Sequence, residues 1–261
     1  MNILVCVKQV PDTTEIKIDP VTNTLIRTGV PSIMNPFDAY AVEQALRLKE
    51  ESGGHVTVVT MGPPQAQEIL TDALARGADK AYLVTDRKFG GSDTLATSYI
   101  LSKVVEKLGG FDAILCGKQA IDGDTGQVGP EMAEHLGIAQ VTYASQIHEK
   151  DGTFEAVREC KAYQEIISVP APAVFTVVKG EVPPRFETIR GRLWANRCEI
   201  GVLDCEVVPV EEGHIGLTGS PTKVRRTFTP ERHADCVWIQ GEDAKEQAKG
   251  LCGALARANV I

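Results

Sequence analysis

Residues with the chemistry of a ligand-binding loop are concentrated between Cys116 and Glu131, a stretch that reads CGKQAIDGDTGQVGPE. Its four glycines allow the backbone to approach a ligand closely and to take up positive φ angles. Free N–H groups at the start of a following helix present donors and partial positive charge to phosphate. This glycine-rich loop therefore predicts a strand, a turn that could hold a pyrophosphate, and a helix. An ordinary strand-to-helix turn, with Asp124 or Thr125 as N-cap, is the competing interpretation.

Other candidate ligand contacts lie at predicted helix starts. Asp38 falls in the first turn of a helix that begins at Asn35 and Pro36, and Thr94 and Thr97 fall near the start of another. A carboxylate at a helix start is favoured by the helix dipole, and hydroxyl groups there cap helices more often than they bind ligands. The five histidines form no metal-binding or nucleophile pattern, so we expect neither a catalytic side chain nor a metal site.

Short apolar runs that alternate with helical patterns position these residues. Strands are predicted at residues 3–7, 55–60, 81–85 and 113–116, with helices between them. This order is typical of an α/β fold with a doubly wound parallel sheet. The loops that follow the strands should converge at the carboxyl edge of the sheet, where such folds bind ligands.

The second half of the chain changes pattern. Short alternating runs at residues 141–143, 154–158, 163–168 and 173–178 predict added antiparallel strands, and 15–27 and 198–210 predict a hairpin and a further strand. Residues 212–229 contain too few apolar side chains for a core, and a strand-like run at 236–239 and a helix at 243–258 follow. We therefore expect an α/β domain over residues 1–210 and a C-terminal arm over 211–261 that packs on another subunit.

Residues 179–197 carry more basic than acidic side chains, although the whole chain has a net charge of −8. Ile189, Leu193 and Trp194 stand among arginines that include Arg190 and Arg192. Because Trp and Arg are favoured interface residues, this segment predicts a docking surface. A solvated loop whose apolar side chains fold back is the alternative.

Composition excludes several classes of protein. The acidic net charge gives no general attraction to nucleic acid, and no apolar run approaches the ~20 residues of a spanning helix. The N-terminal sequence lacks signal-peptide features, and the seven cysteines contain no CxxC pair. We expect a cytoplasmic protein with reduced cysteines, no nucleic-acid partner and no membrane insertion.

Five motifs, in order, are VCVKQVPD, NPFDAYAVEQAL, VTMGPP, the glycine-rich loop and VRECKAYQEIISVPAPAVFTV. Along essentially its whole length the chain resembles the β subunit of electron-transfer flavoproteins. The resemblance implies an adenine-nucleotide-binding α/β domain, an arm that wraps an α subunit, and a recognition loop around Ile189 that docks on a dehydrogenase. The implied cofactor-binding residues are Cys6, Asn35, Pro36, Phe37, Asp38, Met61, Ala120, Asp122, Gly123, Asp124, Thr125, Gly126, Gln127, Val128 and Gly129, joined by Thr94 and Thr97. Asp122 and Asp124 would repel phosphate unless they bind ribose or amides.

The nature of the bound nucleotide separates two groups within that family. Members that only carry electrons hold AMP in the β subunit, whereas electron-bifurcating members hold a second FAD there. The segment 86–97 and Asp38 resemble the bifurcating group, so FAD is expected and AMP is the alternative. The implied activity is hydride transfer from NADH to this FAD. One electron then passes to the α-subunit flavin and an acyl-CoA-type or hydroxy-acid dehydrogenase, and the other to ferredoxin or flavodoxin.

Two rivals use related folds. A nucleotide-binding sensor protein would explain the loops but not the arm or the arginine-rich segment. An ATP-using transferase of the pyrophosphatase type would need an SGGxDS-like loop, and the sequence contains none.

Overall fold

The computed structural model describes residues 1–12, 31–225 and 236–261. These fall into two compact units, Met1–Arg225 and Arg226–Ile261. The hairpin predicted at residues 15–27 lies outside the described residues.

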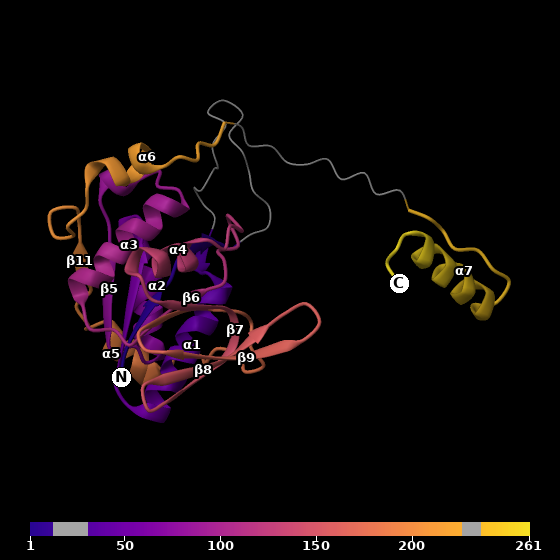
Figure 1. Ribbon diagram of the computed structural model, residues 1–261, viewed down its shortest axis with the longest axis horizontal. Helices are drawn as coiled ribbons and strands as arrows, with labels where there is room; N and C mark the ends of the chain where they lie inside the picture. The colour runs from indigo at the N-terminus through magenta and orange to yellow at the C-terminus, as the bar shows by residue number, and fades with distance from the viewer. Residues whose placement is uncertain (13–30, 226–235) are drawn as a thin grey trace. The chain divides into compact units, whose positions relative to one another are not determined.

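The first unit is built on a nine-stranded sheet with the order β11-β5-β4-β1-β6-β10-β7-β8-β9 (Figure 1). Its strands are β1 (Asn2–Cys6), β4 (His55–Met61), β5 (Lys80–Val84), β6 (Ala113–Gly117), β7 (Ala139–Lys150), β8 (Thr153–Glu159), β9 (Gln164–Pro170), β10 (Ala173–Val177) and β11 (Gly201–Leu203). Neighbouring strands are parallel from β11 to β7, and β8 and β9 continue the sheet antiparallel. The predicted parallel sheet with added antiparallel strands is confirmed.

Helices cover both faces of the sheet. They are α1 (Pro36–Ser52), α2 (Gln67–Arg76), α3 (Thr94–Leu108), α4 (Val128–Leu136), α5 (Ile189–Ala195) and α6 (Gly216–Gly219), with short 3-10 turns η1 (Pro64–Ala66), η2 (Arg87–Phe89) and η3 (Glu212–His214). Successive strand side chains point to opposite faces, so β1 contributes Ile3 and Val5 to the core under α1 and α2, and Leu4 to the core under α3 and α4. The chain runs outward from β1 to β4 and β5, then crosses back to β6. The gap between β1 and β6 is therefore the topological switch point.

The starts of two helices test the predicted caps. Helix α3 begins at Thr94 as expected, and the Asp93 side chain accepts a hydrogen bond from the Ala96 N–H. Helix α4 begins only at Val128, so the prediction of Asp124 or Thr125 as its N-cap is wrong. The reason is that Asp124 and Gly126 have φ angles of 50° and 64°, which turn the chain left-handed before a helix can start.

Several elements of the second half differ from prediction. The strand expected over 198–210 is limited to β11, because the Asp204 side chain accepts hydrogen bonds from the N–H groups of Glu206 and Val207 and forms a turn. Residues 236–239 form no strand. Strand β10 inserts in parallel between β6 and β7, and α5 is a helix that was not predicted. A short antiparallel ladder joins β2 (Gln9–Pro11) to β3 (Ser32–Met34).

Residues 211–225 pack on the first unit. The Lys88 ammonium lies 2.7 Å from the Glu212 carboxylate, and the Ser220 hydroxyl accepts a hydrogen bond of 2.8 Å from the Asp93 N–H. The division between compact units consequently falls at Arg225. The arm over 211–261 remains a prediction, since it concerns packing on a second subunit.

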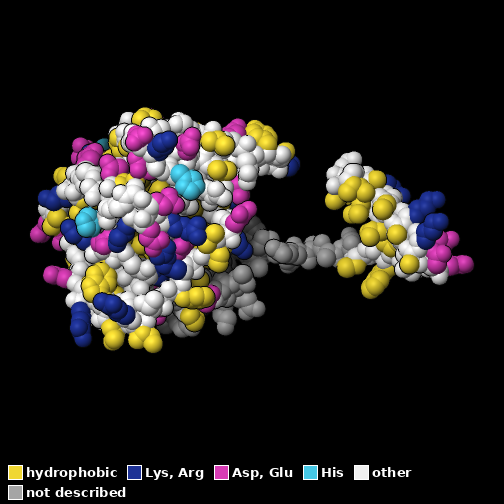
Figure 2. All heavy atoms as spheres, turned by 90° about the horizontal axis from the view of Figure 1, so that it is seen from below, with side chains coloured by type: hydrophobic (Ala, Val, Ile, Leu, Met, Phe, Trp, Pro, Cys, Tyr) yellow, Lys and Arg dark blue, Asp and Glu magenta, His cyan; other side chains and the backbone are white. Residues whose placement is uncertain are grey.

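The C-terminal unit contains helix α7 (Ala244–Arg257), capped by the Asp243 side chain. None of the described residues 236–261 is buried. Apolar side chains gather on one side of this unit and charged ones on another (Figure 2). Its large exposed apolar residues are Val237, Trp238, Leu251, Val260 and Ile261. Within the described part of the chain, no helix is both long and apolar enough to span a membrane.

Candidate nucleotide site at the carboxyl edge

The carboxyl ends of β1 and β6 lie side by side at the switch point, with Cys6 opposite Cys116. One buried carboxylate joins them: Asp38 accepts hydrogen bonds from the N–H of Lys8 at 2.7 Å and from the N–H of Gly117 at 3.0 Å. Burial raises the pKa of Asp38 to about 7, although hydrogen bonds from Asn35, Lys8 and Gly117 oppose this rise. Asp38 thus holds together the backbone that follows β1 and the end of β6. A side chain at Gly117 would overlap Phe37, because an added Cβ would lie 2.7 Å from the Phe37 Cβ.

Asn35 occupies the N-cap position of α1, but its side chain makes no capping hydrogen bond. The amide instead donates to the Gln119 carbonyl at 2.9 Å and accepts from the Ile121 N–H at 3.2 Å. The helix start expected at Asn35 and Pro36 is confirmed, but the Asn35 side chain bonds the loop and does not cap the helix. This fully buried side chain fastens the glycine-rich loop to the start of α1.

The two aspartates of the glycine-rich loop are bonded within the protein. The Lys8 ammonium contacts the Asp122 carboxylate at 2.7 Å and 2.8 Å, and Asp124 accepts a hydrogen bond of 2.7 Å from the Gln119 amide. The ion pair offsets the repulsion of phosphate expected from Asp122, whereas Asp124 keeps its negative charge because its partner is a neutral amide.

Lys118 is the cation that remains. Its ammonium lies 5.0 Å from the centroid of the Phe37 ring and 5.9 Å from that of Tyr143, a cation–π arrangement. Among the described residues it makes no hydrogen bond or ion pair. Tyr143 has a φ angle of 59°, unusual for a bulky residue, and its ring is exposed. The loop thus places a positive charge between two rings, and no carboxylate in the described part of the chain pairs with it.

The N-terminal ends of α3 and α4 meet beside this loop. The Thr94 hydroxyl lies 3.1 Å from the Gln127 amide oxygen and 3.3 Å from one Glu131 carboxylate oxygen. The second oxygen, Glu131 Oε2, is buried and has no hydrogen-bond partner in the described part of the chain. An unsatisfied buried acceptor is costly unless a ligand or water supplies a donor.

Glycine is required at Gly126 and at Gly129 of the loop for different reasons. Gly126 has a φ of 64°, and an added Cβ would lie 3.3 Å from the Lys118 carbonyl oxygen. Gly129 lies inside α4, where a Cβ would lie 2.6 Å from the Thr176 methyl group and 2.8 Å from the Cys116 sulfur. Gly129 therefore allows close helix packing, whereas Gly126 shapes the loop.

The remaining predicted site residues also lie at this edge. Cys6 is buried, and burial, reinforced by Asp38, raises its pKa to about 12, which keeps the thiol protonated. Met61 ends β4, and Thr97 lies within the first turn of α3. The others line the start of α1 or the glycine-rich loop, namely Pro36, Ala120, Gly123, Thr125 and Val128. The sequence analysis missed Lys8, Lys118 and Tyr143. The two lysines were visible inside the quoted motifs, whereas nothing in the sequence marked Tyr143.

Two cavities of about 270 Å³ and about 210 Å³ lie at the opposite edge of the sheet. The larger is lined by residues at the amino ends of strands, including Asn2, His55 and Lys80. Neither cavity is lined by a predicted site residue.

The predicted docking surface centres on α5, which is capped by the Thr188 side chain. Ile189 is 85% exposed, and Leu193 and Arg190 are also exposed, so the apolar side chains do not fold back. Phe186, which was not predicted, is 91% exposed. We call Phe186, Ile189 and Leu193 the docking patch. Arg192 instead faces inward, where it pairs with Asp72 of α2 at 2.6 Å and with Glu187.

The parallel sheet, its switch point and the loops gathered there define a doubly wound α/β protein of the kind that binds ligands at the carboxyl edge. A family model described as "Electron transfer flavoprotein domain" matches residues 22–205. The chain belongs to the electron transfer flavoprotein family, which confirms the resemblance seen in its motifs.

Relatives extend this finding over nearly the whole chain. It is 51% identical over 255 residues to the electron transfer flavoprotein subunit beta of Megasphaera elsdenii, covering 95% of this chain and 94% of the relative. It is 45% identical over 262 residues to the caffeyl-CoA reductase-Etf complex subunit CarD of Acetobacterium woodii, with full coverage of both chains. The acryloyl-CoA reductase electron transfer subunit gamma of Anaerotignum propionicum is 43% identical, again over both full lengths.

Proposed function

We propose that this chain is the β subunit of a heterodimeric electron-transfer flavoprotein and that its carboxyl-edge site binds FAD. The observation that carries the proposal is the Lys118 ammonium, which lies at the switch point of the sheet in a loop whose Asp122 carboxylate is paired with Lys8. A cation in the loop that leads to the N-terminus of α4 suits the pyrophosphate of a dinucleotide.

The residues present fit such a group. Lys118 and the free N–H groups of α3 and α4 would hold the phosphates, and the orphaned Glu131 oxygen would accept a hydrogen bond from a ribose hydroxyl. Asp38 and Asn35 would keep the loop in place beneath them. When bound, FAD would supply hydride acceptance from NADH and one-electron transfer onward, as cofactors rather than side chains do in such proteins.

Two features favour FAD over the structural AMP of simple electron carriers. Segment 86–97 resembles the bifurcating group. Its last residues include Thr94 and Thr97, in the first turn of α3, and the Thr94 hydroxyl lies beside Gln127 of the glycine-rich loop. Two relatives are named as subunits of a caffeyl-CoA reductase complex and of an acryloyl-CoA reductase. We therefore propose that the complex oxidises NADH and bifurcates electrons, to the α-subunit FAD with an acyl-CoA-type or hydroxy-acid dehydrogenase, and to ferredoxin or flavodoxin. The family match leaves a nucleotide-binding sensor without support.

The partner surfaces follow from what is exposed. The docking patch presents apolar side chains bordered by Arg190, which suits the surface of a flavin dehydrogenase. The coreless C-terminal unit suits packing on the α subunit.

The test is to purify the chain with its α subunit, denature the heterodimer, and separate the released nucleotides by chromatography. We expect about two FAD per heterodimer and NADH-dependent reduction of the flavins. If the heterodimer releases AMP and a single FAD, the proposal of bifurcation fails and the protein is a simple electron carrier. A second FAD without reduction by NADH would leave only the flavin site.

A further inference from the structure

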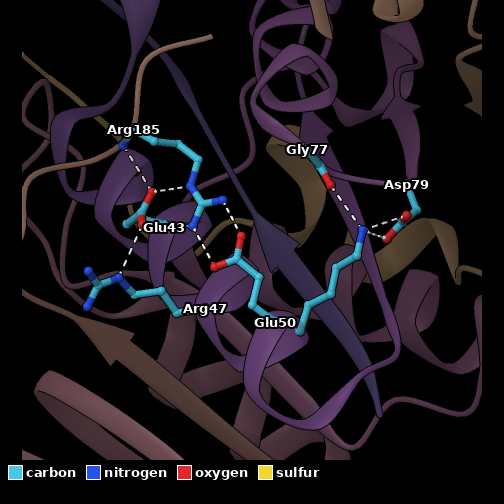
Figure 3. Close-up of polar contacts among 7 residues, drawn as sticks. Glu43, Arg47, Glu50, Gly77, Asp79 and Arg185 are labelled. Atoms are coloured by element: carbon cyan, nitrogen blue, oxygen red, sulfur yellow. Dashed lines mark hydrogen bonds and ion pairs between the residues drawn. The ribbon is translucent and has the colours of Figure 1, made fainter. Parts of the chain in front are cut away.

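A second polar cluster lies away from the nucleotide site, where the segment before α5 crosses α1 (Figure 3). Arg185 donates to one oxygen of Glu43 from its backbone N–H and from Nε, each at 2.9 Å, and to the other oxygen from Nη2 at 3.1 Å. The same guanidinium also contacts the Glu50 carboxylate. Glu43 and Glu50 lie two turns apart on one face of α1, so a single arginine bridges both.

The Glu43 carboxylate is buried and held by two arginines. Its side chain is only 7% exposed, and Arg47 contacts it from the next turn of the helix at 3.2 Å. Burial raises the pKa of Glu43, but hydrogen bonds from Arg185 outweigh this and hold it below its usual value. A buried carboxylate needs such partners, and a bidentate guanidinium is the geometry that best supplies them.

Arg185 also fixes the main chain next to the docking patch. Its backbone N–H bonds Glu43, and its carbonyl accepts a hydrogen bond of 3.2 Å from Arg76 of α2. The next residue, Phe186, consequently points outward and is almost fully exposed. The pattern repeats at the other end of the patch, where Arg192 faces inward to Asp72 while Leu193 faces solvent. Two arginines thus fasten the segment that presents three apolar side chains.

We propose that Arg185 is the positioning residue of the docking patch: by binding Glu43 and Glu50 it holds Phe186 and Ile189 in the arrangement that a dehydrogenase recognises. This inference rests on the proposed docking function. Holding exposed side chains in place before binding removes an ordering cost that the complex would otherwise bear. We call the contacts of Arg185 with Glu43 and Glu50 the clamp. Loss of the clamp should therefore weaken recognition of the dehydrogenase without altering the bound nucleotide or the electron-transfer step.

The experiment compares heterodimers carrying Arg185→Gln, Arg185→Lys and Lys49→Gln with wild type. The electron acceptor is a purified acyl-CoA dehydrogenase that the wild-type heterodimer reduces. Arg185→Gln should raise the KM for the dehydrogenase about tenfold with kcat and nucleotide content unchanged, and Arg185→Lys should raise it less because an ammonium cannot bridge both carboxylates. Lys49→Gln is the matched control. Lys49 lies on α1 like Glu43 and Glu50, but it pairs with Asp79 at 2.6 Å, before β5, and does not touch the segment.

The double variant Arg185→Gln with Ile189→Arg separates the positioning role of Arg185 from the docking role of the patch. If the clamp acts through the patch, adding Arg185→Gln to Ile189→Arg should cause little further loss, because coupled residues are not additive. Independent, multiplied losses would overturn the clamp, as would an unchanged KM in both Arg185 variants or an equal rise in Lys49→Gln. If Ile189→Arg alone has no effect, it is the docking function that fails. Should Arg185→Gln not fold, Arg185→Lys carries the same comparison.

Discussion

The glycine-rich loop and the docking segment, residues 185–195 that carry the docking patch, are both bonded to α1 or its N-cap, but they present side chains of opposite character. In the loop, backbone groups are bonded by the Asn35 and Asp38 side chains, and the Lys118 ammonium makes no hydrogen bond or ion pair with the described residues. In the docking segment, Arg185 binds Glu43 within the protein, and the aromatic and aliphatic side chains of the docking patch are exposed. The difference shows that what a segment binds depends on which of its groups the scaffold has already paired.

The largest expected effect concerns the loop backbone. Replacing Gly126 by Leu forces a bulky side chain to φ 64° beside the Lys118 carbonyl, and should reduce the flavin from about two per heterodimer to about one. Extraction and chromatography of the flavin measure this. Gly110→Leu is the control, because Gly110 has a similar φ of 70° but open space and lies far from the site. Equal losses in both variants would mean general strain rather than blocked binding.

Ile189→Arg tests the other side of the comparison. An apolar anchor at an interface centre is commonly worth ~2 kcal/mol, so reduction of the dehydrogenase at low concentration should fall about thirtyfold. Nucleotide content should stay at the wild-type level, since the residue lies outside the loop. Unchanged rates of dehydrogenase reduction would remove the docking role.

Lys118→Met should weaken retention of the β-site nucleotide by about tenfold, the typical contribution of one charge-assisted hydrogen bond. Its dissociation should also depend less on salt, while Lys118→Arg should stay near wild type. Repeated gel filtration at several salt concentrations, followed by nucleotide assay, gives the measurement. Equal retention in Lys118→Met and wild type would exclude a phosphate contact.

Asp38 should change the stability of the fold and not partner binding, with an effect that is visible through pH. Its pKa is raised in the folded protein to about 7 from an ordinary value near 4, so the native state binds the proton more tightly than the unfolded chain. Its contribution to stability is complete below about pH 4 and is lost as pH rises through about 7, with a slope of at most about 1.4 kcal/mol per pH unit. Thermal unfolding of wild type and Asp38→Asn between pH 5 and 8 should therefore show a flatter profile in the variant. Parallel profiles would mean that Asp38 does not titrate there.

Local patterns predicted the elements that depend on local causes. Pro36 begins α1, and α3 begins at Thr94, both where the sequence predicted a helix start. The loop after β6 was identified because its glycines stand together in the sequence. These features need no knowledge of distant partners.

What the sequence could not predict depends on residues far apart along the chain. The Asn35 amide bonds Gln119, 84 residues away, and Arg185 bonds Glu43 across 142 residues. The nearby pattern at Asn35 indicated only a cap, and nothing near Arg185 indicated a clamp. Lys118 could be seen in the sequence, but the ion pair between Lys8 and Asp122, 114 residues apart, could not.

The position of β10 has a consequence for synthesis. This strand spans Ala173–Val177, yet it lies between β6 and β7 and pairs with both. Until the ribosome has made residue 177, β6 keeps an open edge, and β7, β8 and β9 have no strand that links them to the rest of the sheet. Open strand edges are templates for pairing with other chains. The nascent chain therefore carries its greatest aggregation risk in the middle of translation, and it is the late arrival of one five-residue strand that ends it.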